Sequence, residues 1–385
     1  MLEAMANAAR INPQQLAWMR ERAGLTVDAA ARASGVPMQR FEAWESGDAA
    51  PTLLQAVKLA AALHAPLGYL FLSQAPDEAL PIPDLRTVDS HAAPRLSLNL
   101  QDTIRTALQR QAWYADHLRE TGDDTPLPFV GRMRTQTRAE LIAADMHATL
   151  TPRTQQPDGR PADPMQALIE AAERCGVLVM RSGCVGSDTH RTLDVAEFRG
   201  FAIVDPLAPL VFVNLADAPT ARLFTLVHEL AHIWIGSSGV SDLQPGNHRA
   251  VERLCNAVAG EFLAPGEGFI KRWNAAGDVD VTTRAARIAK ALHVSAQVVM
   301  RRALDLSLIS QDVWREHYLA ELQRFRDQVG GAGNYYRNVS AKNSKRFARA
   351  VLAEALSGRL LLRDAGQLLG MQPSKLQRLA KELDT

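Results

Sequence analysis

Cysteine is scarce in this sequence, and its scarcity excludes two kinds of scaffold. The 385 residues include only three cysteines, Cys175, Cys184 and Cys255, and no pair has CxxC spacing. An odd and sparse set of this kind builds neither a disulfide framework nor a cysteine-ligated zinc site. We therefore expect a protein of a reducing compartment.

Long apolar runs and an excess of one charge are also missing. No apolar run approaches the roughly 20 residues that span a bilayer, and MLEAMANAAR lacks the basic stretch and apolar core of a secretory signal. Lys and Arg total 43 against 42 Asp and Glu, a net charge of +1, so no global field attracts DNA or membrane. We expect a soluble, cytoplasmic protein without a membrane partner, in which any nucleic-acid site is a local patch.

The overall composition is that of an ordinary globular protein, and the chain is long. Hydrophobic residues make up 47% and charged residues 22%, which excludes a disordered chain, a collagen-like repeat and a coiled-coil rod. Because single domains usually hold about 100–150 residues, the chain should contain two or three of them.

Helical spacing of apolar residues dominates the sequence. The helical stretches lie at 12–72, 97–120, 136–150, 165–175 and, with breaks at 264–268, 275–281 and 330–334, throughout the chain after Ala218. Strand patterns are confined to three short segments, 177–180, 198–204 and 210–214. The proline-rich stretch from Gln74 to Pro94 predicts an extended linker. The fold class is therefore α+β and mostly helical, with a small central sheet flanked by all-α elements.

The strongest chemical signal is the pentapeptide from His228 to His232, with the sequence HELAH. Four residues turn a helix by about 400°, so the two imidazoles project from one face, one turn apart, and can share a metal ion. Glu229 then lies beside the metal-bound water. Zinc lowers the pKa of such a water to about 7, and the carboxylate can take its proton and deliver it to a leaving amine. The alternative is a pair of histidines that bind no metal.

A third ligand would complete the site. Glu252 opens another helical run 20 residues after His232, and its carboxylate would give a His2Glu set with the fourth position left for water. Asn256, one turn further on, either orients a ligand or simply packs between helices. His248, one turn before Glu252, either donates to an oxyanion or is solvated. Imidazole and carboxylate ligands suit zinc first, with manganese as the alternative.

Three segments taken together resemble the ImmA/IrrE family of metallopeptidases. They are FRGFAIVDPLAPLVFVN at 198–214, ARLFTLVHELAHIW at 221–234 and ERLCNAVAGEFLAP at 252–265. The resemblance extends over about 165–325 and implies a zincin-like domain, with His228, His232 and Glu252 as metal ligands and Glu229 as catalytic base. Members of this family cleave helix-turn-helix repressors and thereby switch on phage-like, mobile-element or stress genes.

Two further segments near the site suggest how a peptide could be held. The strand LVFVN at 210–214 precedes the histidine helix, and at a sheet edge it could pair with an extended peptide. The alternative is an ordinary core strand. In the polar loop from Ser187 to Arg191, His190 and Arg191 could contact substrate or could be solvated.

Residues 25–52, LTVDAAARASGVPMQRFEAWESGDAAPT, resemble an XRE/Cro-type helix-turn-helix domain. The resemblance implies a recognition helix from Pro37 to Glu45, from which Gln39 and Arg40 could reach base edges. However, residues 1–75 hold six basic and six acidic side chains, so they offer few phosphate contacts. DNA binding and protein docking both stay open, and a homodimer is expected only by analogy with such domains.

The C-terminal residues 334–385 are basic, with ten Lys and Arg against four Asp and Glu, a net charge of +6. They predict three helices, at 343–356, 362–370 and 373–383, and the last two have helix-turn-helix spacing about Gly370. A solvated basic bundle, a nucleic-acid site and a docking site for an acidic partner all stay open.

The sequence predicts five parts and one principal function. The parts are a helix-turn-helix domain at 1–75, a linker at 76–96, a helical connecting region at 97–160, a metallopeptidase domain at 161–329 and a basic helical region at 334–385. The predicted function is a regulatory zinc endopeptidase that cleaves a helix-turn-helix repressor or antitoxin. The alternative is a DNA-binding repressor or antitoxin, partnered by a toxin, whose metal site is structural or sensory.

Overall fold

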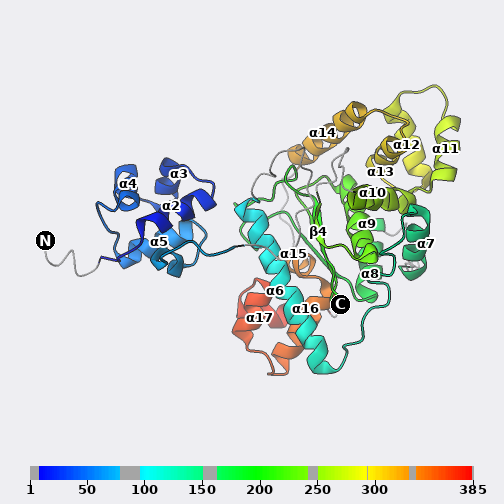
Figure 1. Cartoon of the computed structure of the whole chain (residues 1–385). Helices are drawn as coiled ribbons and strands as arrows, with labels where there is room; N and C mark the ends of the chain where they lie inside the picture. Colours follow the sequence, from blue (N-terminus) through cyan, green and yellow to red (C-terminus); the bar gives the residue numbers. More distant parts are fainter. Residues whose placement is uncertain are drawn as a thin grey trace. The chain divides into compact units, whose positions relative to one another are not determined.

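A computed structural model (Figure 1) describes residues 8–78, 96–150, 163–241, 250–292, 294–328 and 335–383. These residues form two compact units. The first takes residues 8–78 with 96–102, and the second takes the described residues from 103 onward. Most of the predicted linker, the glycine-rich break at 330–334 and His248 lie outside the described residues. Within them, no helix combines the length and apolar character needed to cross a bilayer.

The first unit is the cluster of short helices that the sequence predicts. Its elements are α2 Pro13–Arg22, α3 Val27–Ser34, α4 Met38–Ser46, α5 Leu53–Ala62 and the 3-10 helix η1 Leu67–Phe71. Thr26 caps the start of α3 by accepting from the Ala29 amide, and Gly35 ends it with a φ of 68°, a left-handed conformation that glycine adopts without strain. Phe41 and Trp44 of α4 are fully buried in the core of this unit.

A four-stranded mixed sheet lies at the centre of the second unit. Its strands are β1 Leu178–Ser182, β2 Gly200–Ile203, β3 Leu210–Asn214 and β4 Gly239–Ser241, in the order β1-β3-β2-β4. β1 runs parallel to β3, and β2 runs antiparallel to both β3 and β4. The expectation that 210–214 could be a sheet edge is therefore wrong. Strands on both sides take its hydrogen bonds, and all five of its residues are buried.

Helices cover this sheet and confirm the predicted α+β, mostly helical class. Before the histidine motif come α6 Leu98–Thr121, α7 Ala139–Thr149 and α8 Pro164–Arg174, and the motif itself lies on α9 Pro219–Ile235. α9 packs on β2 and β3, and α10 Ala250–Leu263 packs on α9 and on α7 (Figure 1). Apolar side chains of β3 and α9 share one core, including Val211, Val213 and Leu230.

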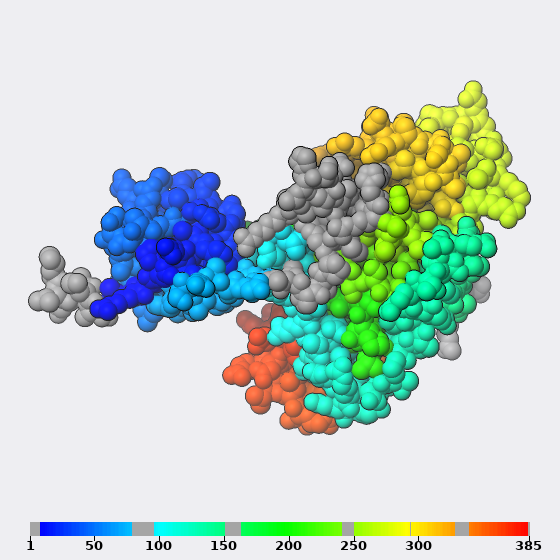
Figure 2. Space-filling view, viewed as in Figure 1, coloured from blue at the N-terminus to red at the C-terminus, as the bar shows by residue number. Residues whose placement is uncertain are grey.

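The remaining helices complete the second unit. They are α11 Gly266–Ala275, α12 Val281–Leu292, α13 Ala296–Asp305, α14 Gln311–Gln328, α15 Tyr335–Asn343, α16 Lys345–Leu356, α17 Leu362–Leu369, the 3-10 helix η2 Pro373–Lys375 and α18 Leu376–Leu383. α15 packs on β1, and α16 to α18 pack on one another. In the space-filling view these last helices, orange to red, lie at the surface (Figure 2). The three predicted C-terminal helices are thus confirmed.

Candidate metal centre

The helix that carries the histidine motif, α9, is buried over most of its length. It starts at Pro219, whose missing N–H is not needed in the first helical turn, and it ends at Gly236 with a φ of 77°. Every residue from Phe224 to Ile235 is buried. His228 and His232 lie one turn apart on this helix, and the first turn of α10 presents Glu252 to both of them.

Three ligand atoms converge between the two helices. The Nε2 atoms of His228 and His232 lie 3.2 and 3.1 Å from the two carboxylate oxygens of Glu252, and 3.2 Å from each other. A tetrahedral zinc site with bonds of about 2.0–2.1 Å separates its ligand atoms by about 3.4 Å, so the observed spacing fits one metal ion. Within the described part of the chain, no other group of three His, Cys, Asp or Glu side chains converges in this way.

The turn after α9 orients one of the imidazoles. Because Gly236 reverses the chain, the Ser237 carbonyl returns to within 3.0 Å of the His232 Nδ1 atom. The N–H on Nδ1 donates to that carbonyl, which leaves the Nε2 lone pair for a metal. Sequence reasoning did not single out Ser237. Its signal was the glycine directly after the last helical residue.

The protonation states also suit metal binding. Burial lowers the pKa of His228, so its imidazole is neutral at neutral pH. Burial alone would raise the pKa of Glu252, but its closeness to the Nε2 atoms of His228 and His232 outweighs this effect and holds the pKa well below its usual range. A neutral imidazole and an ionised carboxylate are the forms that bind a cation.

Glu229 lies against the sheet, next to the ligand set in sequence. It is 0% exposed, as are His228, His232 and Glu252. Its side chain occupies the space beside Gly200 of β2, where an added Cβ would lie 2.7 Å from Glu229 Oε1 and 2.9 Å from the Phe212 carbonyl oxygen. A glycine inside a strand marks such a close approach, and sequence reasoning passed over Gly200.

We expect Gly200→Ala to lower the free energy of unfolding by about 1–3 kcal/mol, because the new methyl group must displace either the Glu229 side chain or the neighbouring strand. Urea unfolding measures this change. Gly68→Ala is the control, since an added Cβ there meets nothing within 4 Å. Equal unfolding free energies for Gly200→Ala and the wild type would show that the contact is not tight.

Asn256 and Cys255 are buried on the same helix as Glu252. Among the described residues, Asn256 makes no hydrogen bond with His228, His232 or Glu252, so its orienting role stays a prediction. Cys255 packs in the main core, where burial raises the pKa of its thiol well above the usual value. Cys255 therefore acts as a small apolar residue of the core and not as a nucleophile.

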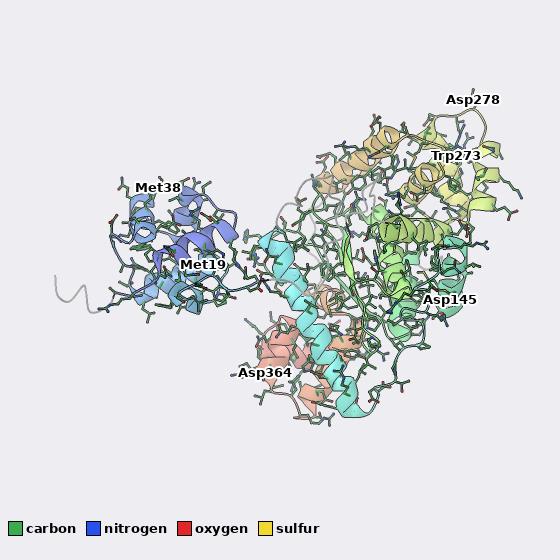
Figure 3. The ribbon with its side chains drawn as sticks, viewed as in Figure 1. Met19, Met38, Asp145, Trp273, Asp278 and Asp364 are labelled. Carbon is green, nitrogen blue, oxygen red and sulfur yellow. The ribbon has the colours of Figure 1, made fainter. Side chains whose placement is uncertain are left out.

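The other candidate residues lie at the protein surface. Gln39 and Arg40 are exposed in the first turn of α4. Figure 3 shows Met19 inside the first unit and Met38, the first residue of α4, at its surface. His190 is exposed as well, and its loop contacts the C-terminal helices, with the Ser187 hydroxyl donating to the Gly370 carbonyl.

Fold and site together define a metallopeptidase type of domain, in which two histidines of one helix and a glutamate of the next face each other over a small sheet. Comparison with known families agrees. Residues 172–304 match the IrrE N-terminal-like domain of a peptidase family, and residues 14–68 match a helix-turn-helix domain. Residues 343–382 match a domain of unknown function, and no curated protein matches the chain. The chain therefore combines a helix-turn-helix domain with an IrrE-like peptidase domain, as the resemblance to the ImmA/IrrE family predicts.

Proposed function

We propose that this protein is a zinc-dependent endopeptidase that acts as a regulator. It cleaves a helix-turn-helix repressor or an antitoxin, and so releases stress, phage-like or toxin–antitoxin genes. The observation that supports it best is the convergence of three ligand atoms, one each from His228, His232 and Glu252, because three protein ligands leave a fourth position for chemistry. His228, His232 and Glu252 would hold the metal, with zinc favoured over manganese by their nitrogen and oxygen donors.

A zinc ion held there would polarise the scissile carbonyl and lower the pKa of a water molecule. Glu229 then acts as the base that takes the proton from the attacking water and later gives it to the leaving amine. The packing against Gly200 holds its carboxylate in one place. The Ser237 carbonyl keeps His232 in the tautomer that this chemistry needs.

The helix-turn-helix domain supplies the regulatory side of the proposal. Exposed Gln39 and Arg40 stand at the start of α4, where side chains of such a helix reach base edges. A homodimer through this domain would read two half-sites. A regulator that cleaves a DNA-bound repressor must share a compartment with the DNA. We therefore propose that this protein acts in the cytoplasm.

One observation favours a second function, that of a DNA-binding repressor or antitoxin with a structural or sensory metal, partnered by a toxin. All three ligand candidates and Glu229 are 0% exposed, and a site that is buried from solvent suits a metal with a structural role. The intact Glu229 argues for catalysis, since a structural site has no use for that carboxylate.

The deciding experiment compares new protein N-termini in cells that express the wild type or Glu229→Gln, with and without DNA damage. The endopeptidase predicts new termini that depend on Glu229, and they identify its substrate. If no such terminus arises under either condition while the protein shifts its own promoter DNA in a gel, the metal-dependent repressor is the correct function.

A further inference from the structure

The last three helices form a well-defined motif of their own. From the turn geometry, the exposed face and the charge of this segment, we propose that Leu362–Leu383 is a second DNA-binding helix-turn-helix, with Gln372–Lys381 as its DNA-reading face. This site is separate from the proposed peptidase and gives a role to the matched domain of unknown function at 343–382. Its ligand is duplex DNA.

The turn between α17 and the next helix has the tight geometry of such a motif. Gly370 has a φ of 65°, a conformation that a side chain would strain. At Gly366, one turn earlier, an added Cβ would lie 2.8 Å from the Met371 carbonyl oxygen. Only a residue without a side chain fits there, so the two glycines allow the helices to cross closely.

The second helix of the motif is amphipathic, and its apolar side is already used. Leu376, Leu379 and Leu383 are buried, and α18 packs on α16 and α15. The opposite face is exposed and consists of Gln372, Pro373, Ser374, Gln377, Arg378 and Lys381. The residues at 374, 377, 378 and 381 recur at helical spacing, so they share one side of the helix. Glu382 is exposed as well and lies one helical turn after Arg378, at the edge of this face.

The chemistry of that face suits DNA. Glutamine can bind adenine through two hydrogen bonds, arginine binds guanine or phosphate, and lysine and serine bind phosphate oxygens. The distribution of charge also favours DNA as the ligand. Residues 334–385 carry a net charge of +6, while the other 333 residues hold 33 basic and 38 acidic side chains, a net charge of −5. Within the C-terminal region, the motif Leu362–Leu383 holds four basic and two acidic side chains, a net charge of +2. An acidic protein would use the charge, but it would not require the glutamine and serine side chains.

Side chains from other parts of the second unit form hydrogen bonds with the turn of the motif. The carbonyls at the end of α17 are bound from three elements. Arg110 of α6 donates to Leu368, Asn343 of α15 donates to Leu369, and Ser187 donates to Gly370. All three of these contacts bind backbone carbonyls at the turn between the two helices. Figure 3 marks Asp364 on α17, and Figure 2 shows the C-terminal helices at the surface.

The test measures binding of the full chain to a labelled 25-base-pair duplex of mixed sequence as salt is varied. Gln39→Ala/Arg40→Ala serves as the background, so that the first helix-turn-helix does not mask the second. In this background, we expect Arg378→Ala/Lys381→Ala to weaken binding at least about fivefold, and to lower the slope of log affinity against log salt by about two. Gln377→Glu should also weaken binding, because it sets a negative charge on the DNA-reading face.

Lys271→Ala/Lys290→Ala is the matched control. It removes two exposed positive charges from α11 and α12, far along the chain from the motif, and it should leave affinity and slope unchanged. The proposal fails if the background protein does not bind the duplex, or if Arg378→Ala/Lys381→Ala binds it as tightly. An equal loss in the control also overturns it, because the effect is then one of total charge. Poly-glutamate that competes as well as DNA for the same two side chains would identify an acidic protein partner instead.

Discussion

Replacing Glu229 with glutamine should slow peptide cleavage by about 10²- to 10⁴-fold and leave the metal bound, because general base catalysis contributes about this factor. Glutamine has nearly the same volume, so it fits beside Gly200 as the glutamate does. It cannot accept the proton of the attacking water. Initial rates on the substrate identified from the new N-termini, together with metal content per chain, measure both effects.

The Glu229→Gln result separates catalysis from folding. Suppose that the variant keeps its metal content and its midpoint of urea unfolding but no longer cleaves the substrate. The substitution has then removed only the general base. If Glu229→Gln cuts its substrate as fast as the wild type, Glu229 is not the base, and the proposed chemistry is wrong.

The second large effect is on the metal itself. We expect Glu252→Ala to weaken zinc binding more than about 100-fold, since loss of a mere supporting contact already costs about 10- to 100-fold in metal sites. Glu252 contributes both of its oxygens to the cluster, at 3.2 Å from His228 Nε2 and 3.1 Å from His232 Nε2. Two imidazoles alone would be left to hold the ion. Competition of a chelating dye for zinc measures the change.

A matched pair of substitutions on α10 guards against an effect of misfolding. Glu252→Gln keeps the volume of the side chain, and Glu261→Gln makes the same chemical change at a carboxylate that pairs with Arg302. Zinc affinity should fall for Glu252→Gln only. Unchanged metal content in both Glu252 variants would remove this residue from the ligand set.

The sequence could predict those parts of the fold that depend on neighbouring residues. The cap at Thr26, the glycine turn at 35 and the two histidines on one helix face are all set within a few residues. The contact of Glu252 with the histidines was predictable for a different reason. Two histidines one turn apart need a third ligand to complete a metal site, and Glu252 opens the next apolar helix, 20 residues after His232.

What could not be predicted depends on pairing between distant segments. The three residues of β4, Gly239–Ser241, are too few to show an alternating pattern, and the helical periodicity expected throughout the chain after Ala218 is wrong there. The position of β3 between two other strands is decided by how β1 pairs with it, 32 residues away, and no local pattern encodes that pairing. The same holds for Gly200, whose importance depends on Glu229.

The place of Glu229 beside Gly200 also sets a limit for protein engineering. The five residues HELAH cannot be transplanted as a cassette, because their carboxylate occupies a space that a strand elsewhere in the chain leaves empty. A designed host needs that gap and also the glycine turn that returns a carbonyl to His232. The smallest portable unit is therefore a helix, the turn after it, the helix that carries Glu252 and a strand from an earlier part of the chain.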